Sequence, residues 1–230
     1  MQPTIITIDG PAASGKSTIA QMLAEKLDYL YLDTGCMYRA TTLAAIKAGI
    51  ELSNEAEVTQ LAGEIDMKIK PLAGQTDGRQ YTVLLDGEDV TWDIRSPAVD
   101  SHVSLISSYR GVRHEMVKRQ RQIGRRGLVV MVGRDIGTVV MPDAPLKLYI
   151  IASPEERVRR RWLDRIEQGH EADYLDILAD VNRRDQFDSS REVSPLRAAE
   201  DAITIDNTNR SPEDILGQIL NLIVEQDSSE

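Results

Sequence analysis

The chain has 230 residues and a formal net charge of −10, with 41% hydrophobic and 28% charged residues. Glycine and proline contribute 15 and 9 residues, a composition that excludes collagen-like and largely disordered chains. No stretch approaches the roughly 20 apolar residues that a membrane-spanning helix needs, and no basic leader precedes the first apolar run. We therefore expect a globular, cytoplasmic protein without a membrane partner.

Residue usage also argues against a structural metal and against a nucleic-acid partner. The single cysteine, Cys36, cannot pair within the chain, and three scattered histidines provide no zinc-ligand spacing. The acidic charge and the 4% aromatic content disfavour nucleic acid. However, the chain has 20 arginines against 7 lysines, and 16 of these arginines lie between Arg110 and Arg197. Planar guanidinium groups suit phosphate, although each could also pair with an acidic residue on a solvated helix.

Strands and helices alternate along most of the chain. A β-branched run at residues 4–9 leads through a Gly-rich turn into a helical pattern, and a second strand at 29–32 is followed by a helix that Gly49 closes. Further buried-type strands are predicted at residues 128–133, 146–152 and 202–206. This alternation predicts an α/β fold with a doubly wound parallel sheet in three layers.

The segment between residues 66 and 95 has a different pattern. It reads DMKIK, then a Gly-rich turn, then YTVLLDGEDV, in which Asp86-Gly87 is typical of a hairpin turn. These features predict a small antiparallel β subdomain inserted into a single core.

One motif carries most of the chemical information. Residues 10–17 fit G-x-x-x-x-G-K-[ST], the loop whose backbone N–H groups and following helix surround phosphates. Gly10 and Gly15 allow a tight backbone nest, Lys16 neutralises the β- and γ-phosphates, and the Ser17 hydroxyl is placed to bind Mg²⁺. The motif lies between a predicted strand and a predicted helix, as it must. The expected contacts with ATP are Gly10, Pro11, Ala12, Ala13, Ser14, Gly15, Lys16, Ser17 and Thr18.

A phosphate-binding loop by itself is compatible with an ATPase, a GTPase, a kinase or a nucleotide sensor. The guanine-reading Asn-Lys-x-Asp motif is missing, because no Asn in the chain is followed by Lys. The one Asp-x-x-Gly, from Asp214 to Gly217, falls in an apparent C-terminal helix and not after a strand. The many arginines favour a kinase, because a phosphoryl donor and a second anionic substrate must be held together without mutual repulsion.

Three arginine-containing segments are candidates for that second anion site. Arg134 and Asp135 follow the strand at 128–133, and ligands of parallel sheets bind beyond the carboxyl ends of strands. The other two segments place their charged residues on one helical face, as a lid or a salt-bridge ladder would. They comprise Arg157, Arg160 and Arg161, and then Arg184, Asp188 and Arg191.

Four segments make the chain resemble the bacterial cytidylate kinases, which are nucleoside-monophosphate kinases. They are GPAASGKST at 10–18, LDTGCMYRA at 32–40, DGEDVTWDIRSPAV at 86–99 and GRDIGTVVMPDA at 133–144. The resemblance runs almost from end to end, and the last three segments are much more particular to that family than the loop. It implies a single domain over 1–230 with a five-stranded parallel core, a mobile lid and a β insert. The expected bounds are 1–65, 99–152 and 171–230 for the core, 66–98 for the monophosphate-binding insert and 153–170 for the lid.

The resemblance also implies roles for individual residues. Ser104, Arg113 and Asp135 match the cytosine-reading positions; a carboxylate opposite an arginine suits the amino group and acceptors of cytosine, whereas uracil would face Asp135 with a carbonyl. Arg157 and Arg161 belong to the lid and stabilise charge on the transferring phosphoryl group. The remaining acceptor contacts are Thr34, Tyr38 and Arg39 beside the nucleotide, with Arg39 toward its phosphate, Arg134, Arg184 and Arg191 as phosphate ligands, Asp188 for the ribose hydroxyls, and Arg95 as a further contact on the acceptor side.

The resemblance therefore predicts a monomeric, ATP- and Mg²⁺-dependent kinase for CMP and dCMP. The catalytic residues would be Lys16, Arg134, Arg157, Arg161 and Arg184. A kinase for UMP, AMP or a non-nucleotide metabolite is the nearest alternative. A regulatory nucleotide binder without turnover is a further one, but a sensor needs one phosphate site and has no use for a second.

Overall fold

The computed structural model describes residues 2–71, 74–167 and 173–227. Several predicted positions lie outside the described residues: residue 1, residues 72–73 of the insert, 168–170 of the lid, and 171–172 and 228–230 of the core. The chain divides into two compact units, Met1–Tyr29 with Leu128–Glu230, and Leu30–Gly127. The expected division into core, insert and lid stays a prediction.

The first unit contains the phosphate-loop motif and alternates strands with helices. Its strands are β1 (Ile5–Asp9), β6 (Val129–Gly133), β7 (Leu146–Ile151) and β8 (Ile203–Asp206). Its helices are α1 (Lys16–Leu27), the π-helical turn η2 (Ile136–Val140), α6 (Pro154–Glu167), α7 (Tyr174–Ser190) and α8 (Pro212–Asp227). Every predicted strand of this unit is confirmed within one residue of its predicted ends.

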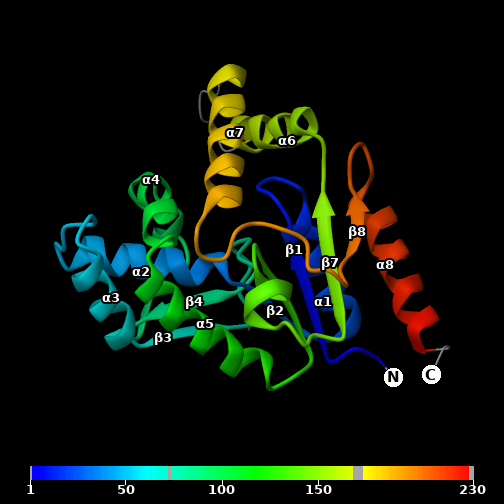
Figure 1. The fold of residues 1–230 in the computed structure, drawn as a ribbon, viewed down its shortest axis with the longest axis horizontal. Helices are drawn as coiled ribbons and strands as arrows, with labels where there is room; N and C mark the ends of the chain where they lie inside the picture. The colour runs from blue at the N-terminus through cyan, green and yellow to red at the C-terminus, as the bar shows by residue number, and fades with distance from the viewer. Residues whose placement is uncertain (1, 72–73, 168–172, 228–230) are drawn as a thin grey trace. The chain divides into compact units, whose positions relative to one another are not determined.

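The central sheet has five strands in the order β2-β6-β1-β7-β8, in which β2 is Leu30–Asp33. The pairs of β1 with β6 and β7, and of β7 with β8, are parallel. In β1, Ile6 and Ile8 are fully buried on one face and Thr7 on the other, which is why the strand reads as a continuous β-branched run. Figure 1 shows β7 and β8 side by side, with α8 beside β8 and with α6 following the carboxyl end of β7. The predicted doubly wound parallel sheet is confirmed.

The second unit begins with β2 (Leu30–Asp33) and contains the predicted insert. A three-stranded antiparallel sheet pairs β3 (Met67–Lys70) with β4 (Thr82–Leu85), and β4 with β5 (Glu88–Asp89). Asp86 and Gly87 both have positive φ, 50° and 87°, as a tight two-residue hairpin turn requires. The predicted antiparallel hairpin and its turn are therefore confirmed.

Helices complete the second unit. They are α2 (Gly35–Lys47), α3 (Glu55–Glu64), the 3₁₀ turn η1 (Asp93–Arg95), α4 (Pro97–Ile106) and α5 (Arg110–Gly124). Helix α2 packs against α4, η1 and β4, and α3 packs against α5. Among the described residues, no helix is long and apolar enough to cross a membrane.

Candidate active site

The phosphate-loop motif connects β1 to α1 in the first unit, as predicted. Gly10 has φ +148°, and a Cβ there would lie 2.1 Å from the carbonyl oxygen of Ile150. Gly15 has φ +87°, and a Cβ there would lie 2.4 Å from Nδ2 of Asn207. Only glycine combines a positive φ with such close neighbours without strain. The close neighbour is a different atom at each of the two glycines, so each is required for its own reason.

The loop ends in a helix N-terminus suited to an anion. Helix α1 begins at Lys16, its N-cap residue is Gly15, and within the described residues no side chain caps its first N–H groups. The first turn of α1 carries no acidic residue. Unsatisfied N–H groups and the positive end of the helix dipole both favour a phosphate here. The Lys16 ammonium donates to the carbonyl of Pro11 at 2.9 Å, which folds the lysine back over the loop.

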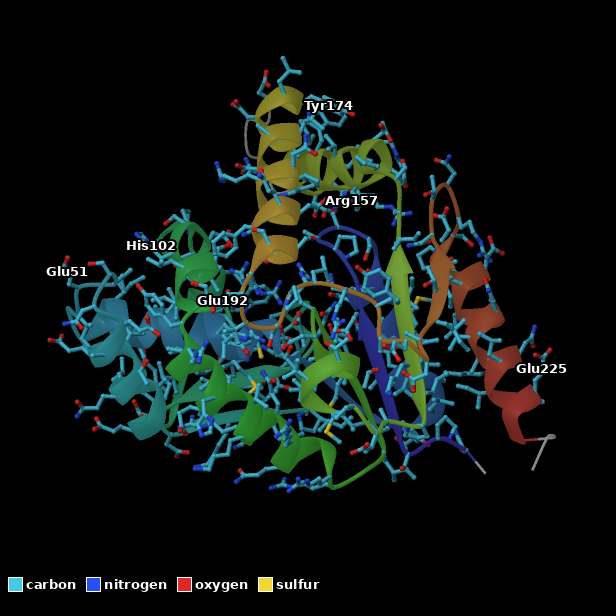
Figure 2. All side chains as sticks on the ribbon, viewed as in Figure 1. Glu51, His102, Arg157, Tyr174, Glu192 and Glu225 are labelled. Atoms are coloured by element: carbon cyan, nitrogen blue, oxygen red, sulfur yellow. The ribbon has the colours of Figure 1, made fainter. Side chains whose placement is uncertain are left out.

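Arg157 braces the loop from helix α6. Its side chain is 5% exposed and pairs with the Asp185 carboxylate of α7 through both terminal nitrogens, at 3.0 and 2.5 Å. Nη1 also donates to the carbonyl of Ala12 at 3.3 Å, and Nε donates to the carbonyl of Ala152 at 3.2 Å. Figure 2 shows Arg157 on the side of α6 that faces the loop. The arginine thus joins α6, α7 and the phosphate loop.

A second brace combines Arg160, which belongs to one of the candidate arginine segments, with Asn207, which was not predicted. Arg160 Nη1 donates to the carbonyl of Ser14 at 3.3 Å and Nη2 donates to the carbonyl of Asn207 at 2.7 Å, while Asn207 Nδ2 donates to the same Ser14 carbonyl at 2.8 Å. The Ser14 hydroxyl is fully buried and has no hydrogen-bond partner among the described residues. Two sequence signals point to this brace. Arg160 lies three residues after Arg157 on one helical face, and Asn207 directly follows a parallel strand.

Asp9, at the carboxyl end of β1, is a further residue that sequence reasoning missed. Its carboxylate accepts from the backbone N–H groups of Ile136 at 2.9 Å and Gly137 at 2.8 Å. Burial is the main cause that raises the pKa of this carboxyl to about 6, against the lowering effect of the two N–H donors. Asp9 therefore ties the loop after β6 to the strand that precedes the phosphate loop.

Three of the predicted acceptor residues of the first unit, Arg134, Asp188 and Arg191, are in contact. Asp188 of α7 accepts from Arg134 Nε at 3.0 Å and also from Arg191, which closes the helix. Asp135 is buried and directly precedes η2. Arg184 lies in α7 and Arg161 in α6, and these two helices pack against each other. The arrangement gathers Arg134, Asp188 and Arg191 into one charged cluster.

In the second unit, the predicted residues gather at the start of α2. Thr34 is the N-cap residue of that helix, and Tyr38 and Arg39 lie in its first two turns. Arg39 Nη1 donates to the carbonyl of Ile94 at 3.0 Å and Nη2 donates to Asp100 at 2.6 Å. This places Arg39 against η1, the turn that ends in Arg95.

Ser104 and Arg113 are connected through Ser107, which was not predicted. The Ser107 hydroxyl donates to the carbonyl of Ser104 at 3.0 Å, and Arg113 Nη1 donates to the carbonyl of Ser107 at 3.1 Å. Arg113 is 4% exposed, and its guanidinium lies 5.6 Å from the centre of the Tyr38 ring. A buried arginine between a carbonyl and an aromatic face is held in one orientation.

The residues of the phosphate loop are compatible with a magnesium ion bound together with a nucleotide. Within the described residues, no group of three His, Cys, Asp or Glu side chains could hold a metal ion. Ser17 lies in the first turn of α1, directly after the loop. Mg²⁺ commonly takes few protein ligands and shares the oxygens of the substrate's phosphates.

The fold and this loop define a nucleotide-binding protein of the phosphate-loop class, and comparison with known proteins identifies the family. The sequence model of the cytidylate kinase family matches residues 6–225. Proteins named cytidylate kinase are 49% identical in Bacillus velezensis, covering 97% of both chains, and 46% identical in Bacillus subtilis strain 168, covering 95% of both. A crystal structure of an uncharacterized protein from Eubacterium ventriosum is similar in fold, with a TM-score of 0.54, 12% identity, and coverage of 97% of this chain and 99% of that one. The chain belongs to the cytidylate kinase family.

Proposed function

We propose that this protein transfers the γ-phosphoryl group of ATP to CMP, and to dCMP, giving CDP or dCDP and ADP. The observation that carries the proposal is the Gly10–Ser17 loop at an uncapped helix N-terminus, in a chain of this family. The relatives named cytidylate kinase support CMP as the acceptor and do not favour UMP. A cytoplasmic location and a monomeric state remain predictions from the sequence.

The reaction forms one bond and breaks one. A phosphate oxygen of CMP attacks the γ-phosphorus, the bond from that phosphorus to the β,γ-bridging oxygen breaks, and ADP leaves with the electron pair. The attacking phosphate is largely dianionic at neutral pH, because its second pKa is near 6, so the step needs no general base. Catalysis then consists of positioning and charge stabilisation through a loose, in-line transition state.

On the donor side, the loop residues 10–15 and the first turn of α1 would hold the phosphates of ATP. The Lys16 ammonium would neutralise the β- and γ-phosphates, Thr18 would add a contact, and Ser17 would hold Mg²⁺, which when bound offsets charge on the β- and γ-oxygens. Arg157 and Arg161 are the proposed lid arginines. Because the donors of Arg157 already bind the loop and Asp185, we assign Arg157 the added role of holding the loop in shape.

On the acceptor side, the proposed roles follow the family pattern. Ser104, Arg113 and Asp135 would read cytosine. The phosphate ligands would be Arg39, Arg95, Arg134, Arg184 and Arg191, with Thr34 and Tyr38 beside the nucleotide and Asp188 on the ribose hydroxyls. The ion pairs of Asp188 with Arg134 and Arg191 support this assignment, since they gather two guanidinium groups, which suit phosphate, around one carboxylate.

The test is an acceptor panel with purified protein and MgATP, following ADP formation above the no-acceptor background. We expect fast turnover with CMP and dCMP, weak turnover with UMP, and none with AMP, GMP or dTMP. Asp135→Asn should shift the preference toward UMP, because an amide can donate to the uracil carbonyl. Asp143→Asn, at an exposed carboxylate, is the matched control. Turnover with no acceptor, or UMP preferred by the wild type, would refute the proposal.

A further inference from the structure

Three of the predicted acceptor arginines lie over aromatic rings. The chain has only ten aromatic residues, 2 Trp, 7 Tyr and 1 Phe, so this coincidence is informative. In each pair the guanidinium carbon is 5.1–5.6 Å from the ring centre, within the range of cation–π attraction. The pairs are Arg95 over Trp92, Arg113 over Tyr38, and Arg191 over Phe187.

Of the three pairs, Trp92–Arg95 has the most exposed aromatic partner. The Trp92 side chain is 46% accessible, although large apolar side chains are usually buried. The Arg95 guanidinium lies 5.6 Å from the centre of its ring. Within the described residues, no carboxylate forms an ion pair with Arg95. The ring therefore contacts a guanidinium whose positive charge is not compensated by a carboxylate.

The ring of Trp92 is itself held in place by a hydrogen bond from its indole N–H. Its indole N–H donates to Asp77 Oδ2 at 3.1 Å. Arg79 holds that carboxylate through Nε, at 2.9 Å from both oxygens, and through Nη2 at 2.7 Å, and its Nη1 reaches Asp89 at 2.6 Å. The hydrogen bonds from Arg79 hold the pKa of Asp77 well below its usual range, so the acceptor for the indole stays ionised at any assay pH.

The backbone under Arg95 is also held. Arg39, which is predicted to lie toward the acceptor phosphate, donates to the carbonyl of Ile94 at 3.0 Å. The backbone N–H of Arg95 donates to the carbonyl of Trp92 at 2.9 Å and closes the turn η1. The main chain before Arg95 is thus held by a hydrogen bond, and its guanidinium lies against a ring that is itself held by a hydrogen bond.

We propose that Trp92 is a positioning residue for the acceptor: its ring holds the Arg95 guanidinium in place, charged and available, to receive the phosphate of the incoming nucleoside monophosphate. This rests on the proposed function. The physical reason is that a carboxylate partner would have to be displaced by the arriving phosphate, which has the same sign of charge. An aromatic face orders the guanidinium without neutralising it, and so lowers the ordering cost of binding.

A double-mutant cycle tests the pair. Trp92→Leu should raise KM for CMP about two- to fivefold, the size of one exposed cation–π contact, with KM for ATP unchanged. Trp92→Phe should restore most of the loss, because the ring remains. In an Arg95→Met background, Trp92→Leu should have no further effect, because the partner of the ring is gone. Binding of CMP measured by calorimetry gives the same comparison without turnover.

A spectroscopic readout separates positioning from simple support of the fold. The chain has two tryptophans, so in a Trp162→Phe background the emission reports Trp92 alone. We expect CMP to shift that emission and Arg95→Met to abolish the shift. Tyr174→Leu is the matched control: Tyr174 is 41% exposed at the start of α7 (Figure 2), and no described arginine lies over its ring. It should leave KM for CMP unchanged.

The outcomes distinguish this inference from the proposed function. Absent turnover of CMP by the wild type would refute the proposed function. With normal wild-type turnover, an equal effect of Trp92→Leu with and without Arg95, or no effect at all, would overturn the role of Trp92. An equal loss of thermal stability and of CMP affinity in both Trp92→Leu and Trp92→Phe would mean that the residue supports the insert and does not position Arg95.

Discussion

The phosphate loop of the first unit and the acceptor segments of the second are built in different ways. The loop is contiguous, and the side chains that brace it bind its main chain: Lys16, Arg157 and Asn207 all donate to loop carbonyls. In the second unit two cations also lie over aromatic side chains, Arg95 over an indole ring and Arg113 over a phenol ring, and Arg113 donates to a carbonyl as well.

This difference has a consequence for mutation. A loop held through its carbonyl groups keeps one backbone shape, so a change in a brace should alter the whole donor site. A cation that lies over a ring depends on that single contact. A substitution of the ring should therefore affect only the interaction of that cation with the ligand. Four substitutions of the first unit test the first half of this comparison.

The largest expected effect is on turnover. Lys16→Ala removes the cation that would face the transferring phosphoryl group, and loss of such a preorganised charge costs about 10²–10³-fold in kcat. Lys16 lies at the start of α1 and Lys26 at its exposed end, so Lys26→Ala is the matched control and should keep normal kcat. Near-normal turnover by Lys16→Ala, with CMP and MgATP saturating, would contradict the donor-site assignment.

The next effect is on stability. Gly10→Ala forces a Cβ to within 2.1 Å of the Ile150 carbonyl oxygen at φ +148°, which should cost about 2–4 kcal/mol in the free energy of unfolding. Gly49 also has positive φ, +68°, but a Cβ there would meet nothing within 4 Å. Gly49→Ala should therefore cost only about 1 kcal/mol. Chemical unfolding measures both; equal losses would show that the close approach at Gly10 relaxes freely.

Removing a brace should have a smaller effect. Asp185→Ala leaves the buried Arg157 guanidinium without its carboxylate, at a cost of about 1–3 kcal/mol, and should raise KM for ATP because the Arg157 contact with the loop loosens. Asp180, on the same helix, pairs with the exposed Arg183, so Asp180→Ala should cost less than about 1 kcal/mol. If thermal unfolding and KM for ATP respond alike in the two variants, Arg157 does not brace the loop.

The smallest effect is a change in pH dependence. The pKa of Asp9, about 6 in the folded protein, is above its unfolded value of about 3.9. Its stabilising contribution is therefore complete below the unfolded value and is lost as the pH rises through 6. Asp9→Asn cannot lose a proton, so the stability difference between wild type and variant should move in favour of the variant from pH 4 to pH 6 and then level off. Denaturant midpoints measured over that range check this, and a constant difference would contradict the raised pKa.

Much of the fold could be predicted from the pattern of the sequence. The strands predicted at residues 4–9, 128–133, 146–152 and 202–206 are confirmed. Each could be predicted because a short run of apolar residues indicates a buried strand without information from the rest of the chain. The hairpin turn at Asp86-Gly87 is confirmed for a similar reason, since two adjacent residues with positive φ leave a clear sequence signal. The roles of the individual site residues stay predictions.

The alternation of strands and helices and the phosphate loop could be read from the amino-acid order alone, because both depend on residues that are neighbours in the chain. The polar groups that brace the loop become evident only in the folded chain. Helical spacing placed Arg157 and Arg160 on one face, but it could not show that this face meets carbonyls almost 150 residues earlier in the chain. The roles of Asp9, Asn207 and Trp92 were hidden for the same physical reason: a hydrogen bond or ring contact between distant segments has no periodicity along the chain, and it exists only once the strands and turns have brought those segments together.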